Sequence, residues 1–356
     1  MAPITDDTGK SDTEGEPETA EEPPPTQSIP DGHGRYARRP LDIPFSGWRD
    51  IAWRLYQYST EHNLSLTAAG VTFYAMLALL PSMVAFVSIY GLMTDVSSIP
   101  GQLDTLIGIV PGPALDLMRE EMTRIALAER DALSVSFAVS LAISLWSVRN
   151  AVVAMIQAMN IAYGEQEARP FLHQLVISLL FAVGAVLFGI LAVNVVVIAP
   201  VILRFLTLGT IQYVSGITIP LVMALLFNVA ASMLYRYGPN RKPAKIKWIT
   251  SGSLAATLIW IAGSAAFAFY LANWGDYNAT YGSLGAVIGL MMWLYITALA
   301  IVVGAEINAA IEHQTSIDST VGRERPMGQR GAYVADTIGR SLDKDENASK
   351  DAHASA

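Results

Sequence analysis

Residues 281–312 read YGSLGAVIGLMMWLYITALAIVVGAEINAAIE, and this stretch decides the fold. Between about 283 and 310 it contains a single charged residue, Glu306. A helix rises about 1.5 Å per residue, so this segment is long enough to cross the roughly 30 Å of hydrocarbon in a bilayer. The stretch therefore predicts a membrane-spanning helix.

Five more apolar segments of spanning length precede this one along the chain. They cover roughly 66–92, 134–159, 174–203, 211–235 and 248–272. Of all residues 52% are apolar and only 15% are charged, against about 25% charged in a typical soluble protein. Lipid removes the need for a charged surface, so this composition argues against a soluble globular domain. We expect an all-α integral membrane protein with six transmembrane helices.

Shorter amphipathic segments are expected outside these spans. In the longest loop, residues 93–133, apolar residues recur at helical spacing on both sides of Pro111-Gly112-Pro113, which predicts two short amphipathic helices. Residues 47–58 also have apolar positions at helical spacing, and we expect a short helix lying in the membrane interface there. Its apolar residues are Trp48, Ile51, Ala52 and Leu55.

Both ends of the chain are polar. The first 30 residues hold eight acidic residues and one lysine, and few apolar ones. Such a segment buries too little apolar surface to offset the entropy lost on ordering, so we expect residues 1–44 to form a disordered acidic tail. Residues 313–356 are similarly polar, though less acidic, and are expected to form a second disordered tail. The six-helix membrane domain then occupies residues 45–312.

Lysine and arginine are divided unevenly between the two sides of a six-span arrangement. Of those near the spans, fourteen lie on the side of the termini, and the four on the other side are Arg119, Arg124, Arg130 and Arg204. The fourteen are Arg35, Arg38, Arg39, Arg49, Arg54, Arg169, Arg236, Arg241, Lys242, Lys245, Lys247, Arg323, Arg325 and Arg330. Positively charged loops stay in the cytoplasm, so we expect both termini there and the loops 93–133 and 273–281 outside.

Particular residues resemble a known family. The first span reads LSLTAAGVTFYAMLALLPSM, and the block YGSLGA…WLY…GAE runs from Tyr281 to Glu306. Between them lie MNIAYGEQEARP and YRYGPNRKPAKIKWITSGSLAATLIW. In this order, over roughly 45–312, the chain resembles the YihY/virulence-factor BrkB family of bacterial inner-membrane proteins. One departure is Ser251 before Gly252, where the family often has Pro-Gly.

The resemblance implies a six-helix fold in the bacterial inner membrane, with both termini cytoplasmic. It implies no defined activity. Members of the family have been labelled virulence or serum-resistance factors, and some have been suspected of transporting lipids or small molecules. The family has also carried an old ribonuclease BN-type label.

The residues themselves argue against RNA hydrolysis. That reaction generally needs metal-bound water or a paired acid and base. None of the five histidines stands at ligand spacing from another, the cytoplasmic loops hold no carboxylate cluster, and the chain has no cysteine. We expect no enzyme activity, catalytic residue, metal site or cofactor.

A basic loop joins the fourth and fifth spans. It contains Arg241, Lys242, Lys245 and Lys247. These residues either serve only as the positive-inside signal or also contact anionic lipid headgroups. Membrane lipids are the expected partners, nucleic acid is not expected, and the oligomeric state stays open.

Several polar residues fall within or at the ends of the spans, namely Arg149, Glu306, Tyr74, Asn228 and Asn160. A lone arginine near the bilayer centre costs about 2.5–3.5 kcal/mol on insertion scales, so Arg149 should have a partner. Because Glu306 is the only acid within any span, we predict that the two pair across the second and sixth helices. The polar set either lines a substrate path open to the cytoplasm or forms interhelical hydrogen bonds.

Small residues mark places where helices can approach closely or bend. Gly282, Gly285 and Gly289 form a smooth stripe on the sixth span, and Pro81 lies within the first. Close helix packing and a hinge for a moving helix are the two interpretations.

Two hypotheses for the function follow. One is a transporter or flippase-like protein for a lipid or small amphipathic molecule, which would depend on Arg149 and Glu306. The other is a non-transporting membrane scaffold for envelope integrity, which would depend on the polar tails. The substrate, coupling ion and direction of transport are not specified by the sequence.

Overall fold

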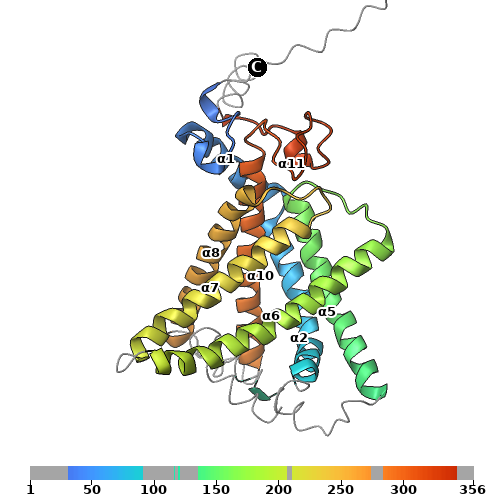
Figure 1. Cartoon of the computed structure of the whole chain (residues 1–356), viewed down its shortest axis with the longest axis vertical. Coiled ribbons are helices and arrows are strands. Elements are labelled where there is room, and N and C mark those ends of the chain that lie inside the picture. The colour runs from blue at the N-terminus through green and yellow to red at the C-terminus, as the bar shows by residue number, and fades with distance from the viewer. Residues whose placement is uncertain are drawn as a thin grey trace, which may run out of the picture. The chain divides into compact units, whose positions relative to one another are not determined.

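The computed structural model describes residues 31–90, 135–206, 211–273 and 284–342, together with residues 116, 119 and 120. The long helices are α1 (Phe45–Glu61), α2 (Leu64–Tyr90), α5 (Val135–Ala162), α6 (Phe171–Leu206), α7 (Ile211–Tyr237), α8 (Ile246–Asn273) and α10 (Leu284–Glu312) (Figure 1). Shorter elements are η1 (Asp31–His33), η2 (Pro40–Asp42) and α11 (Tyr333–Asp336). Within these residues no strand forms, and one isolated bridge joins Ala244 and Thr320.

Five of these helices are long and apolar enough to cross a membrane. The qualifying stretches are Leu141–Ala162, Phe171–Val195, Thr218–Tyr237, Ile246–Asn273 and Val287–Glu312. In α2, Leu64–Leu79 is apolar but shorter, and the helix continues to Tyr90 with Pro81 inside it. The all-helical architecture is thus confirmed. The amphipathic helices expected between 93 and 133 lie outside the described residues, apart from residues 116, 119 and 120.

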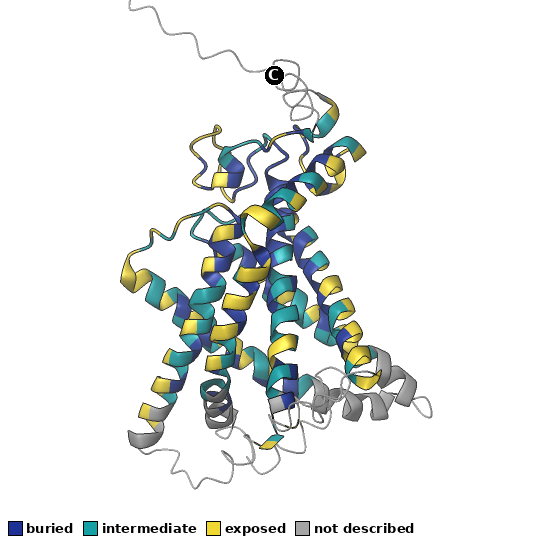
Figure 2. Cartoon of the chain, turned by 180° about the vertical axis from the view of Figure 1, so that it is seen from behind, coloured by how far each residue is buried: buried dark blue, intermediate teal, exposed yellow. Residues whose placement is uncertain are grey.

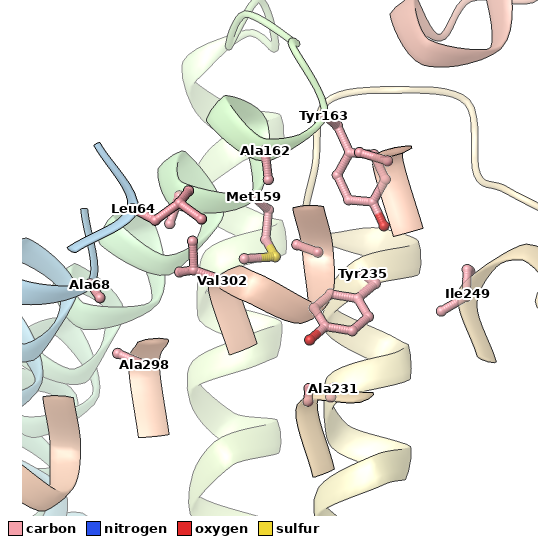
Figure 3. Close-up of a cluster of buried hydrophobic side chains, with 14 of the residues drawn as sticks. Leu64, Ala68, Met159, Ala162, Tyr163, Ala231, Tyr235, Ile249, Ala298 and Val302 are labelled. Atoms are coloured by element: carbon pink, nitrogen blue, oxygen red, sulfur yellow. The ribbon is translucent and has the colours of Figure 1, made fainter. Parts of the chain in front are cut away.

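Helix α10 is the central element. It packs against α1, α2, α5, α8 and α11. Apolar side chains of α2, α5, α7 and α8 pack there against side chains of α10 such as Val302, and Leu64, Met159 and Tyr235 are among them (Figure 3). Because neighbours surround α10, polar residues on its packed faces are removed from solvent.

Glycines allow α8 and α10 to approach each other closely. A Cβ added to Gly252 would lie 2.1 Å from the carbonyl oxygen of Gly304, and one added to Gly304 would lie 2.6 Å from that of Gly252. Contacts below about 3 Å with backbone do not occur for real side chains, so only glycine fits at both positions. Asn308 reinforces the contact by accepting a hydrogen bond from the Gly252 N–H at 2.7 Å.

The chain outside the long apolar helices forms a polar cap, which we define as residues 31–61 and 313–342. Figure 2 shows buried residues gathered where α10 enters this cap. The cap differs from the expected tails, because residues 31–44 and 313–342 are packed. Ala37 and Ile43 join an apolar cluster with Ile51, Trp248 and Ile311. The expected boundaries between tails and membrane domain, at 44 and 312, therefore do not separate disordered from packed residues.

Polar pairing explains why residues 313–342 are ordered despite their composition. The Asp336 carboxylate accepts hydrogen bonds from the backbone N–H groups of Gly328, Arg330 and Gly331. The Arg330 guanidinium donates to the carbonyls of Ser316, Arg325 and Ala335. Charged side chains pair with the backbone groups here, so order does not depend on a large apolar core.

Candidate functional site

The candidate functional site is the pair formed by Glu306 and His62. Glu306 lies on α10, six residues before its end at Glu312. His62 lies in the two-residue turn between α1 and α2. In that turn Asn63 has a φ of +48°, a left-handed conformation that asparagine tolerates better than most residues. The tight turn brings the imidazole of His62 against α10, and its Nδ1 lies 2.6 Å from Oε1 of Glu306.

The two partners differ in their exposure to solvent. The Glu306 side chain is fully buried, whereas that of His62 is 26% exposed. Among the described residues, the second carboxylate oxygen of Glu306, Oε2, has no hydrogen-bond partner. The hydrogen bond that His62 donates to the Glu306 carboxylate raises the pKa of His62 above its ordinary value. His62 therefore connects the solvent to a buried carboxylate that keeps one free acceptor.

A chain of polar contacts joins this pair to the cap. The Tyr58 ring stacks on His62 with 5.3 Å between ring centroids. The Tyr58 hydroxyl lies 3.3 Å from Nδ1 of His313, and Nε2 of His313 lies 2.8 Å from the Thr337 hydroxyl. Burial raises the pKa of Tyr58 and lowers that of His313 to about 4. The imidazole of His313 is consequently neutral near pH 7.

A second ion pair, between Arg241 and Glu312, anchors the basic loop at the end of α10. Both side chains are 1% exposed. The Ser319 hydroxyl also donates to Glu312, and the Arg241 guanidinium lies 4.9 Å from the ring centroid of Tyr163. Together these contacts hold the loop, the cap and α10 in one arrangement, which is a structural role.

The predicted pair of Arg149 and Glu306 does not form among the described residues. The Arg149 guanidinium lies over the Trp146 ring, 5.1 Å from its centroid, and its Nε has no hydrogen-bond partner among those residues. Glu306 is paired with His62 instead. The sequence placed Arg149 farther from the inner end of its helix than Glu306 is from the inner end of α10. The turn between α1 and α2 lies at the level of Glu306, so His62 and not Arg149 is its partner.

The other predicted polar residues do not gather around Glu306. Tyr74 is exposed on α2. Asn228 donates to the Thr257 hydroxyl at 3.2 Å, which joins α7 and α8. Asn160 donates to Glu167 at 3.1 Å and accepts from the Asn240 N–H at 2.7 Å. Both asparagines therefore form hydrogen bonds that join segments of the fold, as in the second interpretation of the polar set, and do not line a path beside Glu306.

The predicted helix-packing stripe is described in part. Gly285 and Gly289 are buried on α10, and Gly282 lies outside the described residues. The close backbone contact of α10 is at Gly304 with Gly252, nearer the cap.

The basic loop offers fewer free charges to lipid headgroups than expected. Arg241 is committed to Glu312. The Lys245 and Lys247 ammonium groups donate to the carbonyls of Asp318 and Arg38, while Lys242 is half-buried. No group of three potential metal ligands occurs within the residues that the structure describes.

Sequence reasoning missed His62, Tyr58 and His313. They lie outside the apolar segments, and the search for a partner of Glu306 was confined to the spans. One signal was present, because His62 directly precedes the first span on the side where Glu306 was expected.

Comparisons with known proteins agree with the membrane architecture. A family model described as "Virulence factor BrkB" matches residues 55–328. "Putative ribonuclease-like protein YfkH" of Bacillus subtilis is 28% identical over 280 residues, which cover 74% of this chain and 95% of that protein. "UPF0761 membrane protein IL2447" of Idiomarina loihiensis is 25% identical over 288 residues, covering 74% and 95%. "UPF0761 membrane protein NTHI0384" of Haemophilus influenzae is 21% identical over 266 residues, covering 74% and 94%. No solved structure matches the chain.

Proposed function

Since this chain belongs to the virulence factor BrkB family of membrane proteins, we propose that it moves a lipid or small amphipathic molecule across the membrane, as a transporter or flippase-like protein. One observation carries the proposal. Glu306 is a fully buried acid on the central helix, held by a partly exposed histidine and with one oxygen unpaired among the described residues. An acid in such a place is a candidate for binding a polar group that passes through the bundle.

Energetics support a role beyond stability. A charged residue within a membrane span costs about 2.5–3.5 kcal/mol on insertion scales. Replacing a buried ion pair by well-packed apolar residues is often neutral or stabilising, so His62 and Glu306 are not needed merely to hold α1 against α10. A functional role explains their presence better. The partly exposed His62 lies on the cap side, so the proposed path opens there.

The membrane arrangement proposed with this function has six spans. α2 supplies the sixth, because it runs from Leu64 to Tyr90 and is apolar from its start. With six spans the cap and both termini lie in the cytoplasm of a bacterial inner membrane, in line with the fourteen-to-four division of lysine and arginine. The chain has no cysteine, so single cysteines can be labelled selectively. In spheroplasts, an impermeant thiol reagent should label D104C and D276C but not K242C, and labelling at K242C would overturn the orientation.

A non-transporting scaffold for envelope integrity is the alternative. The ordered cap favours it, because a packed surface presents fixed contact points to a partner. Deleting residues 315–356 cannot separate the two functions, since that deletion removes the Thr337 contact to His313 beside the candidate site. Substitutions at exposed cap residues such as Arg323 and Glu324 are cleaner. A scaffold should lose function with these and tolerate Glu306→Gln, and a transporter should do the reverse.

We do not extend the ribonuclease-like name of the Bacillus subtilis relative to this chain, and we propose that the chain is not an enzyme. Glu306 pairs with one histidine, His62, and the described residues hold no group of three potential metal ligands that could activate water for RNA hydrolysis. This arrangement is better suited to binding one polar group than to holding an RNA backbone.

Reconstitution tests the proposal. Liposomes containing a phospholipid with a fluorescent headgroup are treated with dithionite, which bleaches only label that reaches the outer leaflet. The wild-type protein should increase the bleached fraction over protein-free liposomes, and Glu306→Gln and His62→Gln should abolish the increase. Gly184→Ala is the control, because a Cβ there meets no atom within 4 Å. Wild-type protein that behaves like protein-free liposomes would refute lipid movement.

A further inference from the structure

One face of α1 packs on the bundle and is polar as well as apolar. Asp50, Ile51 and Arg54 are buried there. The Arg54 guanidinium donates to the carbonyls of Ala310 and Arg340, and Asp50 accepts from the Leu342 N–H at 3.1 Å. These contacts with the end of α10 and the last described residues fix the rotation of α1 about its own axis. The opposite face of the helix therefore points outward.

That outward face carries a row of apolar and aromatic residues. We call it the α1 stripe, and it consists of Leu41, Phe45, Trp48, Ala52 and Tyr56. The last four recur at spacings of three and four, which aligns them along one side of a helix. Leu41 is 92% exposed, Phe45 86% and Tyr56 75%. The sequence pattern had placed Ile51 and Leu55 on the apolar face, but Ile51 packs inward.

The α1 stripe begins at the level where a membrane span starts. η2, which contains Leu41, packs against α8. The Lys247 ammonium, on the second residue of α8, donates to the carbonyl of Arg38. α8 is apolar from Ile246 onward, and its exposed residues Ile246, Leu254 and Leu258 lie on one side of the helix. The lipid-facing surface of α8 therefore begins close to Leu41.

Charge next to the α1 stripe is mainly positive. Arg38 and Arg39 are exposed, Lys247 lies beside them, and Asp42 is the exposed acid in the same stretch. A helix with aromatic residues on one side and basic residues alongside has the composition of helices that lie in the plane of an anionic membrane surface. Basic residues near such a surface are attracted to its anionic headgroups.

We infer that the α1 stripe is a lipid-contacting surface that inserts between the headgroups of the leaflet on the cap side, guided by Arg38 and Arg39. This surface holds α1, and with it the His62 turn, at a fixed depth relative to the spans. The inference does not depend on the transport proposal, because it requires only that the protein resides in a membrane.

Spin labels at single cysteines test this inference in the full-length protein, reconstituted in nanodiscs of phosphatidylcholine and phosphatidylglycerol. Labels at L41C and F45C should collide more with oxygen, which concentrates in lipid, than with an aqueous nickel chelate. M327C is the matched control, because Met327 is an exposed apolar residue of the cap that does not belong to α1, and its label should collide more with the nickel chelate. Labelled proteins are compared only when they elute as the wild type does.

Each other outcome overturns the inference. If the F45C and L41C labels are as accessible to nickel as the M327C label, the α1 stripe lies in water. If they are shielded from both oxygen and nickel, protein covers the stripe, and the acidic residues 1–30 or a second copy is the occupant. The charge contribution has its own test. Pure phosphatidylcholine discs should reduce the oxygen preference at F45C, and Arg38→Gln with Arg39→Gln should remove that dependence on lipid charge; an unchanged dependence would contradict it.

Discussion

Nδ1 of His62 lies 2.6 Å from Oε1 of Glu306, which pairs the turn between α1 and α2 with the central helix α10. The contact spans 244 positions of the chain. It joins a residue that solvent can reach to one that solvent cannot. Protonation of His62 from the solvent therefore changes the charge next to the buried Glu306 carboxylate.

Stability should depend on pH through His62. Its pKa in the folded protein is raised above 6.5 by the hydrogen bond that it donates to Glu306. The folded state holds this proton more tightly than the unfolded state, so the stabilisation is fully present below pH 6.5 and is lost as pH rises through the raised pKa. The melting temperature in detergent should therefore fall above pH 6.5, and it should fall less in His62→Gln. Equal slopes for the two proteins would contradict this linkage.

His313 should act in the opposite direction. Burial lowers its pKa to about 4 from 6.5, so between these values the unfolded state binds the proton and the folded state does not. Stability should decrease as pH falls from 6.5 to 4, by on the order of 3 kcal/mol for this group. His313→Gln, although less stable near pH 7, should show a flatter dependence over that range. Chemical unfolding at several pH values measures both slopes.

A methyl group at the α8–α10 contact should be poorly tolerated. Gly304→Ala or Gly252→Ala would place a Cβ within 3 Å of backbone on the facing helix. Overpacking of this kind costs about 1–3 kcal/mol and sometimes more. Gly184→Ala in α6 meets no neighbour within 4 Å and serves as the control. If the thermal melt of Gly304→Ala matched that of Gly184→Ala, the two helices would not approach as closely as described.

The five long apolar helices were predictable from the sequence because a long apolar run has few alternatives in a bilayer. The prediction that Arg149 pairs with Glu306 was wrong. The depth of two residues along their helices does not determine which way each helix is rotated, nor whether a side chain from a neighbouring turn, here His62, contacts one of them. GxxxG spacing pointed to Gly285 and Gly289, yet the contact at Gly304 depends on a glycine in another helix, Gly252. A contact between glycines of two different helices produces no recognisable spacing within either segment of the sequence.

The cap was missed for a different reason. Composition measures how much apolar surface a segment can bury, and residues 313–342 instead satisfy their backbone with Asp318, Asp336 and Arg330. Such hydrogen bonds between charged side chains and the backbone depend on the folded conformation, which the amino-acid composition does not reveal. Disorder was therefore the expectation for a segment that is packed.

Arg330 should be essential to that packing. Its guanidinium is buried and donates to three carbonyls. Hydrogen bonds to a charged group contribute about 1.5–3 kcal/mol, so Arg330→Ala should lower the free energy of unfolding by at least that amount. Arg323→Ala, at an exposed position of the same segment, should change it by less than about 0.5 kcal/mol. Denaturant unfolding of both variants makes the comparison, and equal effects would mean that the cap is not held by Arg330.

Two double-mutant cycles on the free energy of unfolding in detergent test the central claim most directly. In the first, His62→Gln and Glu306→Gln should be coupled, with the double variant losing less than the sum of the single losses by about 0.5–3 kcal/mol. In the second, Arg149→Gln and Glu306→Gln should be additive within about 0.3–0.5 kcal/mol. Additive losses in the first cycle together with coupling in the second would show that Glu306 pairs with Arg149, and would contradict the account.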